Sequence, residues 1–114
     1  MCSSDLSRDP TVSEAYQRDP AVHGVMTPGA WREIRWAQRS VVADANRIEC
    51  PVLFLLAGED RVVDAQLARA FADGLRAPVQ VRWYPEMYHE VLNDPQRDRV
   101  MSDVVAFLSL HGLA

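Results

Sequence analysis

The chain has 114 residues, of which 48% are hydrophobic and 25% charged. This length fits one domain, and the composition is that of a folded globular protein rather than a disordered one. The formal net charge of -4 argues against nucleic-acid binding driven by bulk electrostatics. The longest apolar run, residues 51–57, is too short for a transmembrane segment.

The cysteines and the N-terminus both favour a cytoplasmic protein. Cys2 and Cys50 are too few for a disulfide framework, and Cys50 is expected to be buried because it precedes an apolar run. No zinc-type spacing of cysteine and histidine occurs, so neither a metal nor a cofactor is predicted. Residues 1–7 lack the apolar core and basic start of a signal peptide. We therefore expect a cytoplasmic, reducing location.

The first half of the chain, up to Ile48, is polar and has a helical pattern. Arg-Asp-Pro triplets occur at residues 8–10 and 18–20. In each triplet an aspartate that can cap a helix precedes a proline suited to the first turn, so each predicts a helix start. A longer helix is predicted at about 28–45, where apolar residues recur with i, i+3, i+4 spacing and arginines lie off that face.

From Ile48 onward, short apolar strands alternate with helices. Residues 51–57 are apolar throughout, which is typical of a strand buried on both faces of a parallel sheet. A helix capped by Asp64 follows, then an alternating strand at 79–84 and a last helix that begins at Asp94 and the proline after it. Because a helix connects the two strands, they should be parallel, with a right-handed crossover. The predicted fold class is α/β.

Two titratable side chains follow the two predicted strands. Asp60 and His89 come shortly after the first and second strand, respectively. Parallel strands end at one edge of the sheet, where α/β proteins place catalytic groups, so the two side chains should reach hydrogen-bond distance. A carboxylate that orients an imidazole is part of a nucleophilic triad. Each residue also has an ordinary interpretation, as a turn residue or surface histidine. Asp64 is a rival acid whose position suits a helix cap, and His23 and His111 are interpreted as structural or surface residues.

At these residues the sequence resembles a known family. Residues 48–64 read Ile-Glu-Cys-Pro-Val-Leu-Phe-Leu-Leu-Ala-Gly-Glu-Asp-Arg-Val-Val-Asp, and residues 84–94 read Tyr-Pro-Glu-Met-Tyr-His-Glu-Val-Leu-Asn-Asp. Both closely resemble the C-terminal third of α/β-hydrolases, in the monoacylglycerol lipase and lysophospholipase branch, also called serine aminopeptidase-like hydrolases. The resemblance implies that Asp60 is the triad acid and His89 the triad base. Upstream, Leu6-Ser-Arg-Asp-Pro and Tyr16-x-x-Asp-Pro resemble the cap that covers the active site in that branch.

The nucleophile of that family has no counterpart in the sequence. It lies in Gly-x-Ser-x-Gly at a strand-to-helix elbow, whereas no pair of the five glycines here brackets a serine. Since the family's chain order is Ser, Asp, His, we interpret the chain as a C-terminal fragment. Residues 1–6 are expected to be non-native, because they match the translation of a common sequencing adapter. Residues 7–47 are assigned to a helical cap or lid remnant, and 48–114 to the C-terminal portion of the core, with two parallel strands and flanking helices.

Two kinds of function remain open. The intact parent is expected to be a serine ester hydrolase that acts on a small acyl ester or lipid-like substrate, and the fragment alone is expected to be inactive. The alternative is a non-catalytic binding or dimerisation module derived from a hydrolase. The same fold also supports haloalkane dehalogenase and carbon–carbon bond hydrolase chemistry. The residues around Asp60 and His89 resemble the lipase-like branch more than these two classes. Because the apolar strand would keep an unpaired edge, the fragment is also expected to self-associate.

Overall fold

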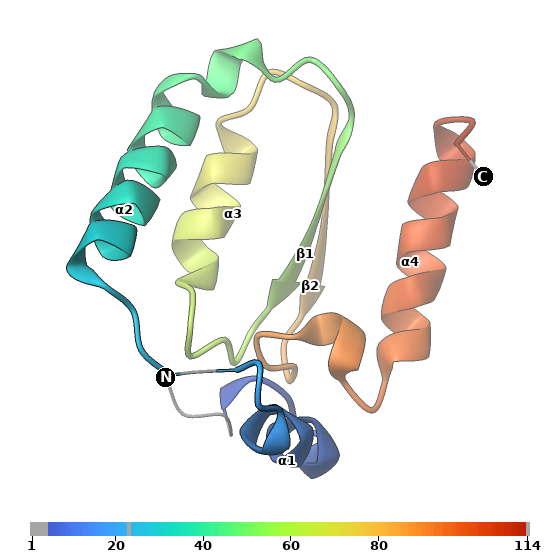
Figure 1. Ribbon diagram of the computed structural model, residues 1–114. Coiled ribbons are helices and arrows are strands. Elements are labelled where there is room, and N and C mark those ends of the chain that lie inside the picture. The colour runs from blue at the N-terminus through green and yellow to red at the C-terminus, as the bar shows by residue number, and fades with distance from the viewer. Residues whose placement is uncertain (1–4, 23, 114) are drawn as a thin grey trace.

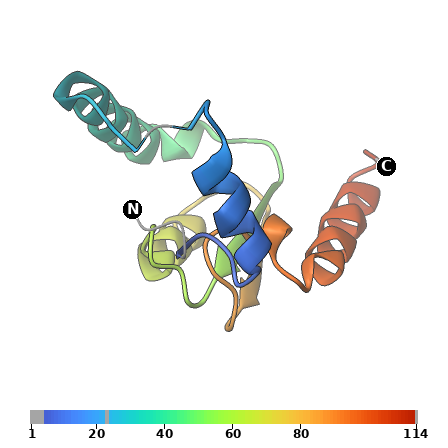
Figure 2. The same ribbon diagram turned by 60° about the horizontal axis from the view of Figure 1, so that its bottom comes forward.

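A two-stranded parallel sheet with helices on both sides forms the centre of the molecule (Figure 1). The computed structural model describes residues 5–22 and 24–113. In chain order the elements are α1 (Pro10–Arg18), α2 (Pro28–Ala43), η2 (Ala45–Arg47), β1 (Val52–Ala57), α3 (Ala65–Asp73), β2 (Val79–Tyr84), η3 (Val91–Asn93) and α4 (Arg97–Leu110). Helices α2 and α3 lie on one side of the strands and α4 on the other, whereas α1 lies beyond the carboxyl ends of the strands (Figures 1 and 2). The predicted α/β class is confirmed.

The strands pair in parallel along their whole length. Val52 pairs with Val79, and the register continues without a bulge to Ala57 and Tyr84. Helix α3 makes the crossover, as the alternation of strand and helix predicted. The expected burial of β1 on both faces is reached only at its last two residues, Leu56 and Ala57. The first four are half-buried, because within residues 5–22 and 24–113 β1 has a partner strand on one side only.

The best-packed part of the molecule lies at the carboxyl ends of the strands, under α4. Its buried residues are Ala57, Tyr84, Met87, Val91 and Val100. The Tyr84 hydroxyl donates a 2.8 Å hydrogen bond to Asp103 on α4. Burial and this hydrogen bond together raise the pKa of Tyr84 to about 12. This cluster therefore holds α4 against β2 next to the loops that follow both strands.

In the first half of the chain, two of the three predicted helix starts are correct and one is wrong. Helix α1 begins at Pro10 with Asp9 as its cap, and α2 begins at Pro28 with Thr27 as its cap. No helix begins at Pro20. Asp19 instead ends α1, and its carboxylate accepts a 2.8 Å hydrogen bond from the Ala21 amide in a single turn that does not continue.

Three further expectations need correction. Helix α2 ends at Ala43, and the predicted last turn is the short 3-10 helix η2. Helix α4 begins at Arg97 rather than at Asp94: residues 95–96 form a turn, and the Asp94 carboxylate accepts a hydrogen bond from the Gln96 amide and also binds Arg8. Cys50 is exposed rather than buried, because it precedes the half-buried end of β1.

Candidate active site

The loops that follow β1 and β2 are in direct contact. The Gly58 amide donates to the Tyr84 carbonyl at 2.8 Å, and the Glu59 amide donates to the Met87 carbonyl at 3.1 Å. A side chain at Gly58 would lie 2.6 Å from Pro85 Cα, so only glycine allows the two backbones to come this close. The loops that carry Asp60 and His89 are therefore locked together at the sheet edge.

The Asp60 carboxylate is fixed by its own loop. Its Oδ1 accepts hydrogen bonds from the amides of Val62 and Val63, at 2.8 and 2.9 Å. Its Oδ2 lies 2.9 Å from Nδ1 of His89, and the side chain is 10% exposed. Burial alone would raise the pKa of Asp60, but the two amide donors and His89 outweigh it and hold the pKa below its usual value. Asp60 is thus an oriented anion that faces the imidazole.

In His89 one ring nitrogen, Nδ1, contacts Asp60, whereas the other, Nε2, has no hydrogen-bond partner within the described residues. The predicted contact with Asp60 is confirmed, with 2.9 Å between Nδ1 and Oδ2. An Nδ1–H that donates to a carboxylate leaves Nε2 without a proton, able to act as a base. Nε2 makes no hydrogen bond within residues 5–22 and 24–113, and the side chain is 34% exposed. The arrangement can therefore accept a proton from a group that approaches Nε2.

The rival acid, Asp64, has a different role. Its carboxylate accepts hydrogen bonds from the amides of Gln66 and Leu67, at 2.9 and 3.1 Å, and caps α3. The other histidine that the structure describes, His111, ends α4 and packs its ring against Phe107 at 4.6 Å between centroids. The expectation for His23 lies outside the described residues.

A short N-terminal segment, which sequence reasoning missed, contacts both loops. Arg8 forms a two-pronged salt bridge to Asp94, with Nε and Nη2 each 2.7 Å from a carboxylate oxygen. The pKa of Asp94 is lowered, mainly because of the hydrogen bonds from Arg8. The partners are 86 residues apart, so no local pattern could have paired them. The Asp94-Pro sequence suggested only a helix start.

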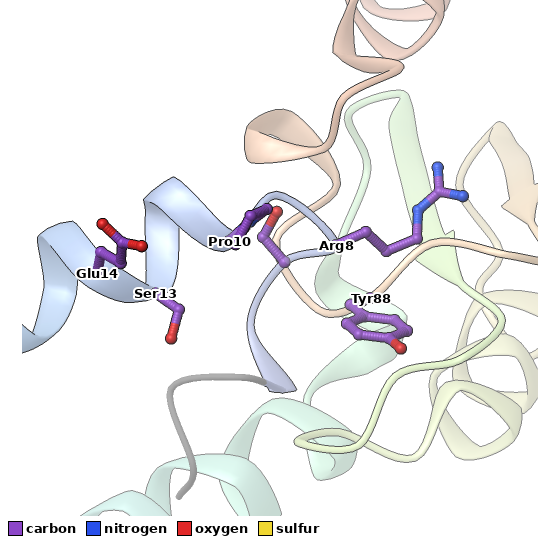
Figure 3. A pocket seen from close by; sticks show the side chains of 6 residues that line it. Arg8, Pro10, Ser13, Glu14 and Tyr88 are labelled. Carbon is purple, nitrogen blue, oxygen red and sulfur yellow. The ribbon is translucent and has the colours of Figure 1, made fainter.

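A pocket opens beside His89 without including it. Residues of α1 and the segment before it face Tyr88 across a hollow of about 590 Å³ (Figure 3). The guanidinium of Arg61, from the Asp60 loop, lies over the Tyr88 ring at 5.1 Å from its centroid. The lining residues are Ser7, Arg8, Pro10, Ser13, Glu14 and Tyr88.

Among residues 5–22 and 24–113, no group of three or more His, Cys, Asp or Glu side chains is arranged to hold a metal ion. In the same part of the chain, no helix combines the length and apolar character needed to cross a membrane.

Comparison with known proteins defines first the fold and then the family. The structure superimposes on the crystal structure of a monoacylglycerol lipase from Paleococcus ferrophilus with a TM-score of 0.84 at 23% identity, covering 97% of this chain and 44% of that one. The fold is therefore that of an α/β-hydrolase. Residues 2–96 match the family described as serine aminopeptidase, S33, and the chain belongs to this family.

Two curated relatives match most of this chain. The monoacylglycerol lipase of Mycolicibacterium smegmatis is 32% identical over 108 residues, which are 93% of this chain and 39% of the relative. Phospholipase YtpA of Bacillus subtilis is 26% identical over 103 residues, 89% of this chain and 40% of that protein. The chain thus spans about two fifths of the length of the curated relatives it matches.

Proposed function

We propose that Asp60 and His89 are the acid and base of a Ser-His-Asp triad in a carboxylic ester hydrolase. One observation carries the proposal: Nδ1 of His89 lies 2.9 Å from a carboxylate that two backbone amides already hold in place. This contact fixes the ring orientation and the tautomer that a general base requires. The nucleophilic serine would come from a part of the hydrolase fold that this chain does not contain.

In the proposed reaction His89 transfers two protons, one during acylation and one during deacylation. The serine oxygen attacks the ester carbonyl carbon while Nε2 takes the hydroxyl proton. When the ester C–O bond breaks, the imidazolium returns that proton to the departing alcohol, and an acyl-enzyme remains. Water then attacks the acyl carbon while Nε2 takes one of its protons. When the bond between the acyl carbon and the serine oxygen breaks, the imidazolium gives that proton to the serine, which releases the carboxylic acid and restores the free hydroxyl. Asp60 stabilises the imidazolium in both steps.

For the substrate we propose a monoacylglycerol or lysophospholipid, a small acyl ester with a polar head group. Two relatives are named monoacylglycerol lipase and phospholipase, names that denote hydrolysis of monoacylglycerols and of phospholipids. We also propose that residues 7–47 are the cap, so that α1 and the pocket that it lines would cover this site. The exposed free thiol of Cys50 is compatible with the cytoplasmic location that we also propose.

A chimeric enzyme tests the proposal. This chain replaces the aligned segment of the Mycolicibacterium smegmatis monoacylglycerol lipase, and release of fatty acid from a monoacylglycerol is measured. We expect activity in the chimera and a loss of about a millionfold in kcat for His89→Ala. His111→Ala is the matched control, because His111 lies at the far end of α4, and it should keep the activity.

The second candidate is the non-catalytic module: within residues 5–22 and 24–113, no hydroxyl group makes a hydrogen bond with Nε2 of His89. The chain by itself should not hydrolyse p-nitrophenyl acyl esters above background, because His89 has no serine to activate and no oxyanion hole is assembled. A folded chimera that releases no fatty acid and does not react with a fluorophosphonate would favour the module. Turnover by the chain alone that disappears in His89→Ala would contradict the proposed origin of the nucleophile.

A further inference from the structure

Four consecutive residues, 5–8, contact the two loops that carry Asp60 and His89. Asp5 lies 3.3 Å from the guanidinium of Arg61, in the first loop. The Leu6 carbonyl accepts a 2.8 Å hydrogen bond from the Glu90 amide, in the second loop. We call residues 5–8 the strap. It leads directly into α1, whose first residue is Pro10.

The strongest contact of the strap is the salt bridge between Arg8 and Asp94. Nε and Nη2 of Arg8 each lie 2.7 Å from a carboxylate oxygen of Asp94, and the Asp94 side chain is 1% exposed. Asp94 also accepts a 2.9 Å hydrogen bond from the Gln96 amide. If a buried carboxylate loses its cationic partner, neither water nor an opposite charge stabilises its negative charge. Without Arg8, this end of the His89 loop would have to move to regain water.

Ser7 holds the residue before Asp94. Its hydroxyl donates a 2.8 Å hydrogen bond to the Asn93 carbonyl and accepts one of 2.9 Å from the Asp9 amide. Together with the hydrogen bond at Glu90, these contacts fix the backbone from the residue after His89 to the end of its loop. The orientation of the imidazole depends on this backbone, because the opposite ring nitrogen makes no hydrogen bond within the described residues.

We propose that Arg8 is a positioning residue: through Asp94 it holds the His89 loop so that Nδ1 stays against Asp60. The catalytic meaning of this role rests on the proposed function, whereas the positioning itself can be measured without activity. Since Arg8 lies two residues before the start of α1, the strap also links the position of α1 to the orientation of the base.

Nuclear magnetic resonance of the chain, labelled with nitrogen-15 in histidine, tests this inference. In the wild type, the Nδ1–H proton of His89 should be observed and protected from exchange by its hydrogen bond to Asp60. Arg8→Gln should accelerate the exchange of that proton by about tenfold or abolish its signal. Arg8→Lys keeps the charge but loses the two-pronged geometry, so its effect should be intermediate.

Two controls separate positioning from loss of folding. Arg69→Gln removes the exposed ion pair with Asp73, 3.0 Å in length, and should leave the His89 signal unchanged. The His111 resonance reports on α4 in the same spectrum and should stay constant in Arg8→Gln. If Arg8→Gln does not fold, Arg8→Lys and Ser7→Ala decide the question, because each removes only part of the strap.

Each outcome bears on one inference. A His89 signal that responds to Arg8→Lys or Ser7→Ala no more than to Arg69→Gln overturns the positioning role. If the signals of all histidines change together in Arg8→Gln, the positioning role is also overturned, because Arg8 would then support only the fold. Absence of the hydrogen-bonded Nδ1–H in the wild type contradicts the Asp60–His89 pair itself, and with it the proposed function.

Discussion

Gly58 is the residue where the two candidate active-site loops come closest. A Cβ atom there would overlap the carbonyl oxygen of Pro85 and lie 2.6 Å from its Cα, and both obstacles are backbone. Gly58→Ala should therefore separate the loops and cost about 3 kcal/mol of unfolding free energy or more, as expected for a clash that cannot relax locally. Denaturant unfolding of the variant measures the loss.

Gly29→Ala is the control for this substitution. A Cβ at Gly29, in the first turn of α2, would meet only the Thr27 hydroxyl at 3.9 Å. Alanine also has the better helix propensity, by up to about 1 kcal/mol, so this variant should be as stable as the wild type or more so. Equal stability of the two variants would contradict the steric argument.

Two buried or half-buried carboxylates should make the molecule sensitive to acid. The pKa of Asp94 is lowered by Arg8, and that of Asp60 is lowered by the Val62 and Val63 amides and His89 against the effect of burial. The unfolded chain therefore binds these protons more readily. Stability is fully present above the unfolded pKa of about 3.8 and is lost as the pH falls from there through the folded pKa values.

Asp94→Asn tests this linkage. The variant should be less stable than the wild type near neutral pH, because Arg8 loses its anion, but its unfolding free energy should fall less steeply below about pH 4. Unfolding by urea over a pH series gives both slopes. Parallel curves for the two proteins would show that Asp94 carries no acid-sensitive stabilisation.

At the residue scale, the Asp60–His89 contact could be predicted from the sequence, whereas the Arg8–Asp94 contact could not. The Asp60–His89 contact could be predicted because both residues follow parallel strands, so topology alone brings them together. The Arg8–Asp94 pair depends on where the strap lies after folding, and its partners are separated by 86 positions. Nothing in either local sequence distinguishes a buried salt bridge from a helix cap.

At the scale of elements, helix α4 is held to β2 through one aromatic residue. The Tyr84 hydroxyl donates to Asp103 at 2.8 Å, and the ring packs under the guanidinium of Arg99 at 5.3 Å. Tyr84→Phe removes the hydrogen bond but leaves Asp103 paired with Arg82 at 3.0 Å. We expect a loss of about 1 kcal/mol at neutral pH. Tyr16→Phe, on the exposed face of α1, should cause none.

The same pair gives a prediction at alkaline pH. The pKa of Tyr84 is raised from 10.0 to about 12 in the folded protein, so its contribution is fully present below pH 10 and lost as the pH rises through about 12. The stability difference between wild type and Tyr84→Phe should therefore be constant up to about pH 10 and shrink above it. A difference that does not depend on pH would contradict the hydrogen bond to Asp103.

Helix boundaries were predictable where local chemistry decides them. Pro10 and Pro28 begin helices because each follows a side chain that accepts a hydrogen bond from the first turn. Asp19 has the same local chemistry before Pro20, yet its turn ends at once. Asp94 also accepts a hydrogen bond from the amide two residues further on, yet α4 begins only at Arg97. Its carboxylate binds Arg8 in addition, a tertiary contact that no local pattern indicated.

At the scale of the whole molecule, one face remains apolar and open. A groove of about 450 Å³ runs between α2, β1 and α3, lined by Ile34, Ala37, Gln38, Val41, Val42, Phe54, Ala68 and Phe71. The neighbouring β1 pairs with β2 alone within the described residues, so its other edge presents unpaired backbone groups. Apolar side chains next to an open strand edge favour association with another chain.

We therefore expect the isolated chain to self-associate, and α2 offers a matched pair of variants to test this. Val41 lines the groove and Trp36 does not, and both are exposed, by 53% and 66%. Val41→Glu should shift the sedimentation profile toward the monomer at micromolar concentration, because it places a charge in the apolar contact. Trp36→Glu should leave the profile unchanged. If the wild type sediments as a monomer and melts in one cooperative transition, the open face is stable in water without a partner, which would favour the stand-alone module over the hydrolase fragment.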